Sequence, residues 1–564
     1  MRIGYAPGPR SGKEQLRMGR TPRFTILWLL LASLLAAQGE GPNISGGPLI
    51  PEQAAVDVAS YDLSLEVFPT EHRIEGTLTA TVRILAPLKD FVLDLDTALQ
   101  VRGARLMPSG QALHFQRKKG RIWVRLPRVF DEGEILAVAV DYGGMPRVAR
   151  RPPWDGGFTW SKTPKGLPWI ATSCQGEGAD LWWPCKDQPS DEPDIMDLRI
   201  IVPQPLVVAS NGTLRTVKNL PNKRRQFHWH VANPINNYGV AIAVAPYVEV
   251  KDVFSSIGGE KVPVTFFALP SDEKKARALM PEILDHLRFF EENFGPYPFR
   301  NEKYGVAETP FLGMEHQTLI AYGYGFRRDP FDYDWLHHHE LSHEWFGNLI
   351  TCPDWRDMWL HEGIGTYTQA LYVEEKHGLD AYLKQMKLYR RTIANRRAIA
   401  PRRTTDSKEI YFGPEGGSDA DIYYKGAWVL HTLRFLIGRE VLMASLRELC
   451  YPDEKSLRAT DGSQCRFRTT EDFRSIVEHR SGMKLDWFFD VYLRQPELPK
   501  LSTQREGSSL KLSWTVPGGR PFPLPVEIRV GGKIRRVPLP NGSATVEVPA
   551  SEPIQIDPSG WILR

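Results

Sequence analysis

The chain has 564 residues, of which 42% are hydrophobic and 24% charged, and its formal net charge at pH 7 is +4. This is ordinary globular composition, and the length is too great for one hydrophobic core, so we expect several domains. Residues 1–37 hold six basic side chains and one acidic one, so their +5 leaves about −1 for the rest of the chain. That balance argues against a nucleic-acid partner, which would call for a basic surface.

The first 37 residues have the pattern of a targeting segment. Several Arg and Lys residues precede an apolar run of 14 residues at 24–37. A run of this length is typical of a signal peptide and short for a membrane span, and Ala37-Gln38-Gly39 offers a cleavage site. We therefore predict a signal peptide over residues 1–37 and export to the periplasm or the extracellular space. The alternative is an uncleaved segment that anchors the protein to a membrane.

Residues 38–52 are rich in Gly and Pro and are predicted to form a flexible lead-in. Beyond them, apolar side chains alternate with polar or smaller ones, as at Tyr61, Leu63 and Leu65. Many short alternating segments separated by turn signals favour an antiparallel sheet. We predict an N-terminal β-domain over residues 53–251.

The next part of the chain has helical periodicity. Apolar residues recur at three- and four-residue spacings over 272–294, which predicts a helix that Pro281 kinks or restarts. Two further helices are predicted over residues 334–350 and 361–377. We expect a mainly α, α+β domain over residues 252–497.

The last part of the chain returns to a period of two. After Pro496 and Pro499, alternation resumes at residues 510–514 and 526–530. Short strands of this kind predict a small β-sandwich over residues 498–564. The expected fold class is therefore multidomain, with an N-terminal antiparallel β-domain, a central mainly α domain and a small C-terminal β-sandwich.

Five cysteines fit an exported protein with one or two disulfides. Cys450 and Cys465 flank a polar, turn-rich stretch, and we predict a disulfide between them. Cys174 and Cys185 are a weaker candidate pair.

The histidine cluster at residues 337–343 is the strongest chemical signal in the chain. His339 and His343 form the pattern H-E-x-x-H, with Glu340 between them. On a helix, positions i and i+4 share one face, so both imidazoles can bind one metal ion while Glu340 acts as general base. Zinc takes imidazole and carboxylate ligands, so the pattern predicts one zinc ion per chain. A cluster of histidines on a polar helix face is the alternative.

Glu362 is predicted to supply the third ligand. Eighteen residues separate it from His343, so a second helix packed against the first would bring its carboxylate to the metal. Two histidines, one glutamate and an open position for water are the ligand set of a hydrolytic zinc site.

The segment HELSHEWFGNL at residues 339–349, with its spacing to Glu362, resembles the core of the gluzincin metallopeptidases of the aminopeptidase N and leukotriene-hydrolase family. The resemblance covers about residues 55–500 and implies a thermolysin-like catalytic domain. One departure is His361, where the family usually carries Asn before the ligand Glu. We expect this change to alter hydrogen bonding around the ligands and to leave the zinc in place.

The stretch Leu312-Gly313-Met314-Glu315-His316 resembles the family's G-x-M-E-N element, an edge strand beside the metal. Such a strand binds extended peptide through main-chain hydrogen bonds. The resemblance gives the Glu the role of binding the substrate's terminal ammonium. Leu312 and His316 stand where the family has Gly and Asn, which leaves the shape of the first pocket open.

Gln175 and Tyr423 complete the implied site. By the resemblance, Gln175 reaches from the β-domain and binds the substrate's free amine, although a solvated turn glutamine is the alternative reading. The Y-x-K-G spacing to Lys425 and Gly426 assigns Tyr423, and not Tyr424, as the hydrogen-bond donor to the oxyanion. The alternative for Tyr423 is amphipathic packing.

Together these residues indicate an exported zinc aminopeptidase that removes N-terminal residues from peptides. Three other interpretations stay open: epoxide hydrolysis, which one branch of the family performs, endopeptidase activity, and a catalytically silent binding protein. We expect peptide substrates, no nucleic acid and no stable protein partner. Membrane association is expected only if the N-terminal segment is uncleaved.

Overall fold

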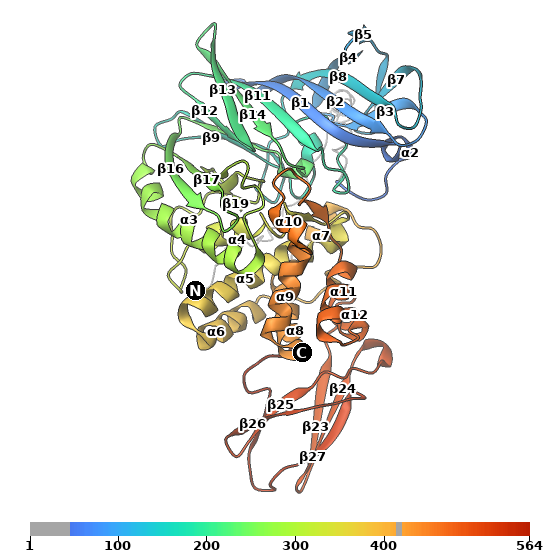
Figure 1. Ribbon diagram of the computed structural model, residues 1–564, viewed down its shortest axis with the longest axis vertical. Coiled ribbons are helices and arrows are strands. Elements are labelled where there is room, and N and C mark those ends of the chain that lie inside the picture. The colour runs from blue at the N-terminus through green and yellow to red at the C-terminus, as the bar shows by residue number, and fades with distance from the viewer. Residues whose placement is uncertain (1–44, 413–419) are drawn as a thin grey trace, which may run out of the picture. The chain divides into compact units, whose positions relative to one another are not determined.

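The computed structural model describes residues 45–412 and 420–564. The predicted signal peptide, residues 1–37, and residues 38–44 of the predicted lead-in lie outside the described residues. Within the described part of the chain, none of the helices has the length and apolar character that crossing a membrane requires. The predicted fold class is confirmed: a β-rich N-terminal domain precedes a domain that carries the long helices, and two small sheets follow (Figure 1).

An eight-stranded sheet is the largest element of the N-terminal domain. In β1, Tyr61, Leu63 and Leu65 are fully buried while their neighbours are partly exposed, so the predicted alternation places one face on the core. Every neighbouring pair is antiparallel except β1 and β11, which are parallel. In sheet order the strands are β13 (Thr213–Leu220), β14 (Arg224–Val231), β11 (Ile195–Pro203), β1 (Val56–Phe68), β2 (Arg73–Ile84), β8 (Ile135–Gly144), β4 (Leu99–Leu106) and β5 (Gln111–Ala112).

Two smaller sheets complete this domain, and one of them leads to the functional site. The first contains β12 (Val207–Ser210), β15 (Ile242–Ala245), β10 (Pro168–Ser173) and β9 (Gly157–Lys162), and the second contains β3 (Leu88–Asp94), β7 (Arg121–Phe130) and β6 (Phe115–Lys118). The chain leaves β10 into a buried loop that includes Gln175. Lys186 anchors this loop, because its Nζ donates to the Val56 carbonyl at 2.7 Å and pairs with Asp191 at 2.5 Å. A short helix, α2 (Pro51–Ala54), precedes β1.

A five-stranded mixed sheet opens the central domain. In order it contains β16 (Val248–Ser255), β17 (Lys261–Ala268), β18 (Tyr304–Glu308), β20 (Ile320–Tyr322) and β19 (Gly313–Met314). The predicted domain boundary after residue 251 falls inside β16. β19 is the terminal strand of this sheet and pairs with β20 alone among the described strands.

The central helices are α3 (Glu273–Phe294), α4 (Trp335–Ser342), α5 (Trp359–His377), α6 (Leu379–Arg390), α7 (Ser407–Phe412), α8 (Asp421–Ile437), α9 (Arg439–Cys450), α10 (Glu454–Arg458), α11 (Thr470–Ser481) and α12 (Asp486–Leu493). Helix α3 continues through Pro281, so the prediction that the helix restarts there is wrong, and the alternative of a kink at Pro281 stays a prediction. Helix α4 ends at Ser342 and not at the predicted residue 350. A short pair, β21 (Ile350–Thr351) and β22 (Arg466–Phe467), links the end of this segment to the later helices.

The C-terminal part consists of two three-stranded sheets. One contains β23 (Lys500–Glu506), β24 (Ser509–Thr515) and β27 (Ser543–Glu547), and the other contains β26 (Lys533–Val537), β25 (Val526–Val530) and β28 (Ile554–Ile556). Leu512 on β24 and Ile528 on β25 are fully buried, as expected for the inner faces of a sandwich. The last residues return to α8, where the Thr432 hydroxyl donates to the Trp561 carbonyl at 3.0 Å.

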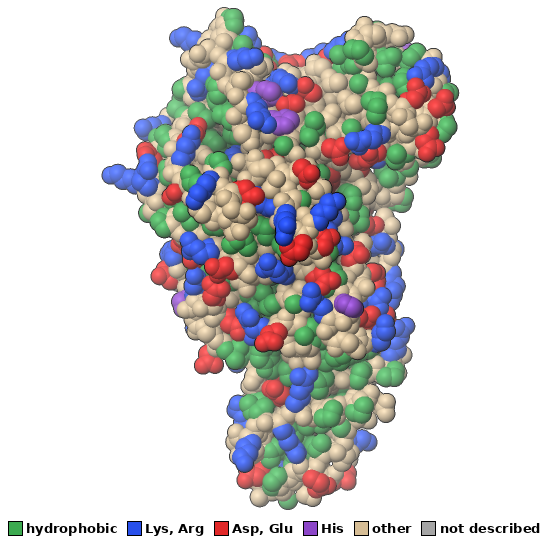
Figure 2. Space-filling view, viewed as in Figure 1, with side chains coloured by type: hydrophobic (Ala, Val, Ile, Leu, Met, Phe, Trp, Pro, Cys, Tyr) green, Lys and Arg blue, Asp and Glu red, His purple; other side chains and the backbone are tan. Residues whose placement is uncertain are grey.

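Charged side chains of both signs are interspersed over the face shown in Figure 2. Arg73 pairs with the exposed carboxylate of Glu71 at 2.7 Å. Exposed pairs contribute about 1 kcal/mol or less each. The stability of the domains therefore rests mainly on buried side chains.

The predicted disulfide between Cys450 and Cys465 is wrong. All five cysteines of the chain are free thiols. The stretch between the two residues is not an open loop, because it contains α10 and a turn that is fixed elsewhere. Gln464 donates to Asn233 Oδ1 at 3.0 Å and to the Pro298 carbonyl at 2.9 Å, which ties the segment beside Cys465 to distant parts of the chain. The weaker candidate, Cys174 with Cys185, is also unformed.

Candidate metal centre and active site

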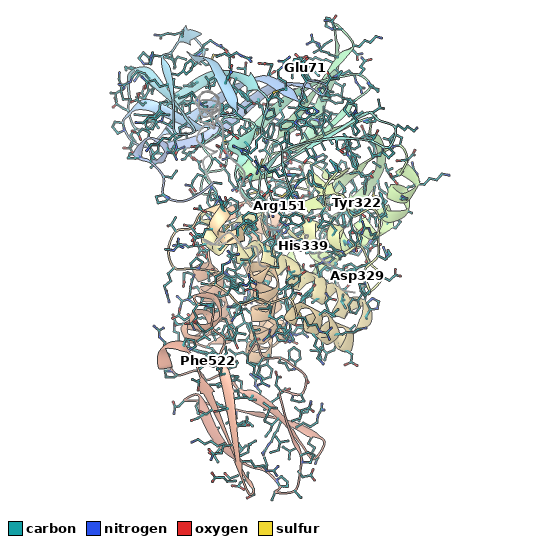
Figure 3. The ribbon with its side chains drawn as sticks, turned by 180° about the vertical axis from the view of Figure 1, so that it is seen from behind. Glu71, Arg151, Tyr322, Asp329, His339 and Phe522 are labelled. Carbon is teal, nitrogen blue, oxygen red and sulfur yellow. The ribbon has the colours of Figure 1, made fainter. Side chains whose placement is uncertain are left out.

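Helix α4 presents the two predicted histidine ligands from one face. Asp334 caps its N-terminus by accepting from the His337 backbone N–H at 3.0 Å. His339 lies within the helix and His343 is its C-terminal cap, with ring centroids 4.9 Å apart. In Figure 3, His339 lies in the helical domain close to the β-rich N-terminal domain.

Helix α5 brings Glu362 to the same point. Glu362 lies in the first turn of α5, and Gly365 faces the end of α4. A Cβ atom on Gly365 would lie 2.6 Å from Ser342 Oγ, so the close approach of the two helices requires glycine at this position. The predicted packing of a second helix against the H-E-x-x-H helix therefore occurs.

The three ligand atoms form a nearly equilateral triangle. His339 Nε2, His343 Nε2 and Glu362 Oε2 lie 3.4 Å from one another in every pair. Tetrahedral zinc with ligands at about 2.0–2.1 Å places those ligands about 3.3–3.4 Å apart, so the triangle fits the ion. Glu362 Oε2 is buried and accepts no hydrogen bond from the described residues. A cation is the partner that this buried carboxylate oxygen lacks.

Hydrogen bonds around the triangle orient its ligands. His343 Nδ1 lies 3.1 Å from the Phe346 carbonyl, which fixes the tautomer with a proton on Nδ1 and turns the Nε2 lone pair toward the triangle. His361, at the position that departs from the family pattern, accepts from the Cys352 backbone N–H through Nε2 at 3.0 Å. Burial lowers the pKa of His361 to about 3, so it remains a neutral acceptor. The imidazole at this position therefore hydrogen-bonds to the backbone, and the three ligand atoms of the triangle still lie 3.4 Å apart.

Glu340 lies in α4 between the two histidine ligands, and its carboxyl group is buried. Burial and the neighbouring Glu315 carboxylate raise the pKa of Glu340 well above its usual range. Glu315, Glu340 and His343 form a second group of possible ligand atoms. The triangle with Glu362 has two imidazole nitrogens and one carboxylate oxygen, each pair 3.4 Å apart, which is the ligand set and spacing of a tetrahedral zinc ion.

Edge strand β19 runs directly against Glu340. A Cβ atom on Gly313 would lie 2.4 Å from Glu340 Oε1 and 2.8 Å from Leu336 Cδ1. Glycine at this position therefore lets the strand and the carboxylate share the space in front of the ligands. Met314, the next residue of the strand, is buried.

Gly313→Ala is expected to displace the Glu340 carboxylate, because the new methyl group and Oε1 cannot occupy the same space. A misplacement of about 1 Å can cost about 10²-fold in rate, so we expect kcat to fall about 10- to 100-fold with bound metal unchanged. Steady-state kinetics and elemental analysis measure both quantities. Gly239→Ala is the matched control, since its Cβ atom would meet only ordinary contacts at 3.8 Å or more. An unchanged kcat in Gly313→Ala would show that the carboxylate tolerates the displacement.

Glu315 and Gln175 lie beside the triangle, as the resemblance implies. Gln175 Nε2 donates to Glu315 Oε1 at 2.7 Å and to Glu362 Oε1 at 2.9 Å. The amide group therefore joins the implied amine-binding carboxylate to a metal ligand. Burial raises the pKa of Glu315 to about 7.

Tyr423, and not Tyr424, faces the ligands. Its ring centroid lies 6.0 Å from that of His339, whereas Tyr424 packs on Tyr389 at 5.1 Å. Burial, followed by the charge of Glu362, raises the Tyr423 pKa well above its usual range. The phenol therefore stays protonated and able to donate a hydrogen bond.

A close crossing of α5 and α8 brings Tyr423 to the site. A Cβ atom on Gly363 would lie 2.9 Å from Gly426 Cα, and one on Gly426 would lie 2.8 Å from Gly363 Cα. The two backbones touch at this pair, one residue after Glu362 and three after Tyr423. The Gly of the Y-x-K-G element thus has a packing role that the sequence interpretation did not state.

Two buried tyrosines of the site were missed by the sequence interpretation. The Tyr411 hydroxyl donates to Glu362 Oε1 at 3.1 Å. Tyr238 is the second. Burial raises the pKa of its phenol well above the usual value, and the negative charge of Glu315 raises it further. Neither residue stands at a motif spacing from the ligands, so no local sequence signal could have identified them.

Comparisons with known proteins agree with this arrangement. Residues 284–492 match the peptidase family M1 domain and residues 58–238 match the peptidase M1 N-terminal domain, which together span more than half of the chain. Aminopeptidase M1-C of Oryza sativa subsp. japonica is 23% identical over 522 residues, covering 86% of this chain and 54% of that protein. Aminopeptidase N of Mus musculus is 24% identical over 299 residues, covering 49% of this chain and 30% of that protein.

Solved structures of M1 zinc metallopeptidases have a similar fold, and the similarity covers almost the whole length of the solved chains. The M1 zinc metallopeptidase of Deinococcus radiodurans has a TM-score of 0.64 at 26% identity, covering 79% of this chain and 95% of that one. A mutant of that enzyme bound to a Tyr-Ser-Ala substrate has a TM-score of 0.63 at the same identity, covering 79% and 96%. The chain spans about half the length of the curated relatives it matches first. The resemblance is confirmed, and the chain belongs to peptidase family M1.

Proposed function

We propose that this protein is a zinc-dependent aminopeptidase that removes N-terminal residues from peptides. The observation that carries the proposal is the 3.4 Å triangle of His339, His343 and Glu362, with Glu340 and Glu315 beside it. The triangle matches a tetrahedral zinc site. The two further carboxylates supply a base and an anchor for a substrate amine.

A zinc ion bound by the triangle would supply a Lewis acid that lowers the pKa of water to about 7 and polarises a carbonyl group. Glu340 is placed to accept the proton of the attacking water and to pass it to the leaving amine. The protonated Tyr423 phenol donates a hydrogen bond to the oxygen on which negative charge develops.

Substrate binding follows from the strand and the amine anchor. β19 is the terminal strand of its sheet, and an extended peptide can pair with such an edge through main-chain hydrogen bonds. The Glu315 carboxylate accepts from the substrate ammonium. Gln175 already uses its Nε2 for two carboxylates, so its Oε1 is the atom that turns to the ammonium. Holding the charged N-terminus at this point restricts cleavage to the first peptide bond.

We further propose that the protein is exported. The basic and apolar pattern of residues 1–37 supports a signal peptide and a periplasmic or extracellular location, with membrane attachment only if the segment is uncleaved. The near-neutral charge of the remaining chain supports peptides and not nucleic acids as substrates. We propose no stable protein partner.

The activity is tested with zinc-loaded and chelator-treated protein on peptides with free and blocked termini. We expect stepwise loss of N-terminal residues, one zinc ion per chain, and loss of both zinc and cleavage in His343→Ala. Mass spectrometry of products and elemental analysis measure these outcomes. Internal cleavage of doubly blocked peptides would identify an endopeptidase. Hydrolysis of an epoxide without peptide cleavage would favour the other branch of the family. Zinc binding with neither reaction would favour the silent binding protein.

A further inference from the structure

The two carboxylate oxygens of Glu362 have different surroundings. Oε2 faces His339 and His343 at 3.4 Å, whereas Oε1 accepts from Gln175 Nε2 at 2.9 Å and from the Tyr411 hydroxyl at 3.1 Å. Glu362 and both donor side chains are buried. The carboxylate therefore has one oxygen committed to hydrogen bonds and one left for a metal ion.

Tyr411 belongs to α7, a short helix whose backbone is itself fixed. The Arg397 guanidinium donates to the Glu409 carbonyl at 2.9 Å and to the Tyr411 carbonyl at 3.1 Å. Ser407 Oγ donates to the Gly176 carbonyl at 3.3 Å, which links α7 to the loop that carries Gln175. The two donors to Glu362 thus come from connected segments, one from each of the two domains that meet at the site.

Such a pair of donors controls how Glu362 can bind a metal. A carboxylate with free rotation can present either oxygen or both, and it loses entropy when a metal fixes one arrangement. Two hydrogen bonds to Oε1 fix this arrangement before binding and keep Oε2 toward the histidines. The partners of metal ligands typically contribute about 10- to 100-fold to affinity. A phenol suits this role because it donates without adding a positive charge that would compete with the metal.

We propose that Tyr411 is a positioning residue for the metal, which holds Glu362 by its Oε1 and so sets zinc affinity. The inference rests on the proposed zinc site. It gives α7 a role in metal binding although α7 contributes no ligand to the triangle and lies outside the sequence motifs of the ligands. It also predicts that removal of one hydroxyl group weakens zinc binding without removing a ligand.

Tyr411→Phe tests the proposal through zinc affinity and not through activity alone. Zinc is titrated against a chromogenic chelator, and its rate of transfer to excess chelator is recorded. We expect affinity to fall about 10- to 100-fold. Tyr372→Phe is the matched control: it removes the hydroxyl of a buried tyrosine on α5, the helix of Glu362, and that hydroxyl donates to Asp285 Oδ2 at 2.8 Å. This control should keep the wild-type affinity.

A second variant covers the case in which Tyr411→Phe folds poorly. Replacing Tyr411 by para-aminophenylalanine keeps the ring and puts an N–H donor where the hydroxyl was, so zinc affinity should recover to near the wild-type value. Thermal unfolding of the metal-free proteins shows whether they fold equally well. Wild-type affinity in Tyr411→Phe, or equal weakening in Tyr372→Phe, overturns the role of Tyr411. A wild-type chain that binds no zinc overturns the proposed function instead.

Discussion

Glu340→Gln is expected to abolish nearly all peptide cleavage while zinc stays bound. Glutamine has almost the same size as glutamate, so it fits beside Gly313 and leaves the ligand triangle of α4 and α5 unchanged. It cannot accept the proton of the attacking water. General base catalysis contributes about 10²- to 10⁴-fold, and we expect kcat to fall by that factor. Steady-state kinetics and elemental analysis on the same preparation give both results.

Glu344→Gln is the matched control for this prediction. Glu344 is buried four residues further along the chain, where it accepts from the Thr318 backbone N–H at 2.8 Å. The amide oxygen of a glutamine can accept the same backbone hydrogen bond, and Glu344 supplies no atom to the ligand triangle. Turnover in this variant should stay within about tenfold of wild type. A Glu340→Gln enzyme that kept a tenth or more of its turnover would rule out Glu340 as the general base.

The metal ligands could be predicted from the sequence because their geometry is mostly local. Helical periodicity alone places His339 and His343 on one face, and a single helix–helix contact adds Glu362. The contact depends on glycine: side chains at Gly365 and Gly363 would separate α5 from α4 and α8. The sequence shows these glycines but not the helices they face, so their role appears only in three dimensions.

The end of α4 could not be predicted from periodicity. Beyond Ser342 the chain continues in turns whose hydrogen bonds have other spacings: Glu344 N–H donates three residues back to Leu341, and Leu349 N–H donates five residues back to Glu344. Apolar residues keep helix-like spacing through such turns. A pattern of side chains therefore does not distinguish this segment from a regular α-helix.

Tyr411 and the cysteines show where local patterns fail for a different reason. Tyr411 reaches Glu362 from α7, 49 residues away in the chain, and no spacing rule connects the two. Cys450 and Cys465 are close in sequence, yet the segment next to Cys465 is fixed by Asn233 and Pro298. In both cases long-range packing decides the contact.

A strong preference for substrates with a free N-terminal amine is the second large effect that we expect. The substrate ammonium would meet the buried carboxylate of Glu315 and the amide oxygen of Gln175. A hydrogen bond to a charged group contributes about 1.5–3 kcal/mol, or about 10- to 150-fold. A substrate without the amine also leaves Glu315 buried without its cationic partner, which places the discrimination at the high end of this range or beyond it.

The measurement compares kcat/KM for a phenylalanyl amide and its des-amino analogue, the 3-phenylpropionyl amide, which removes the amine without adding bulk as N-acetylation does. Wild type should favour the free amine by well over tenfold, and Glu315→Gln should lose most of that preference because its acceptor is neutral. Glu308→Gln is the control, since Glu308 is a buried glutamate of the same sheet whose Oε2 accepts from the Leu269 backbone N–H at 2.8 Å. It should keep the wild-type preference. Equal cleavage of both substrates by wild type would mean that Glu315 and Gln175 do not bind the amine, and the enzyme would then have no structural reason to stop at the first residue.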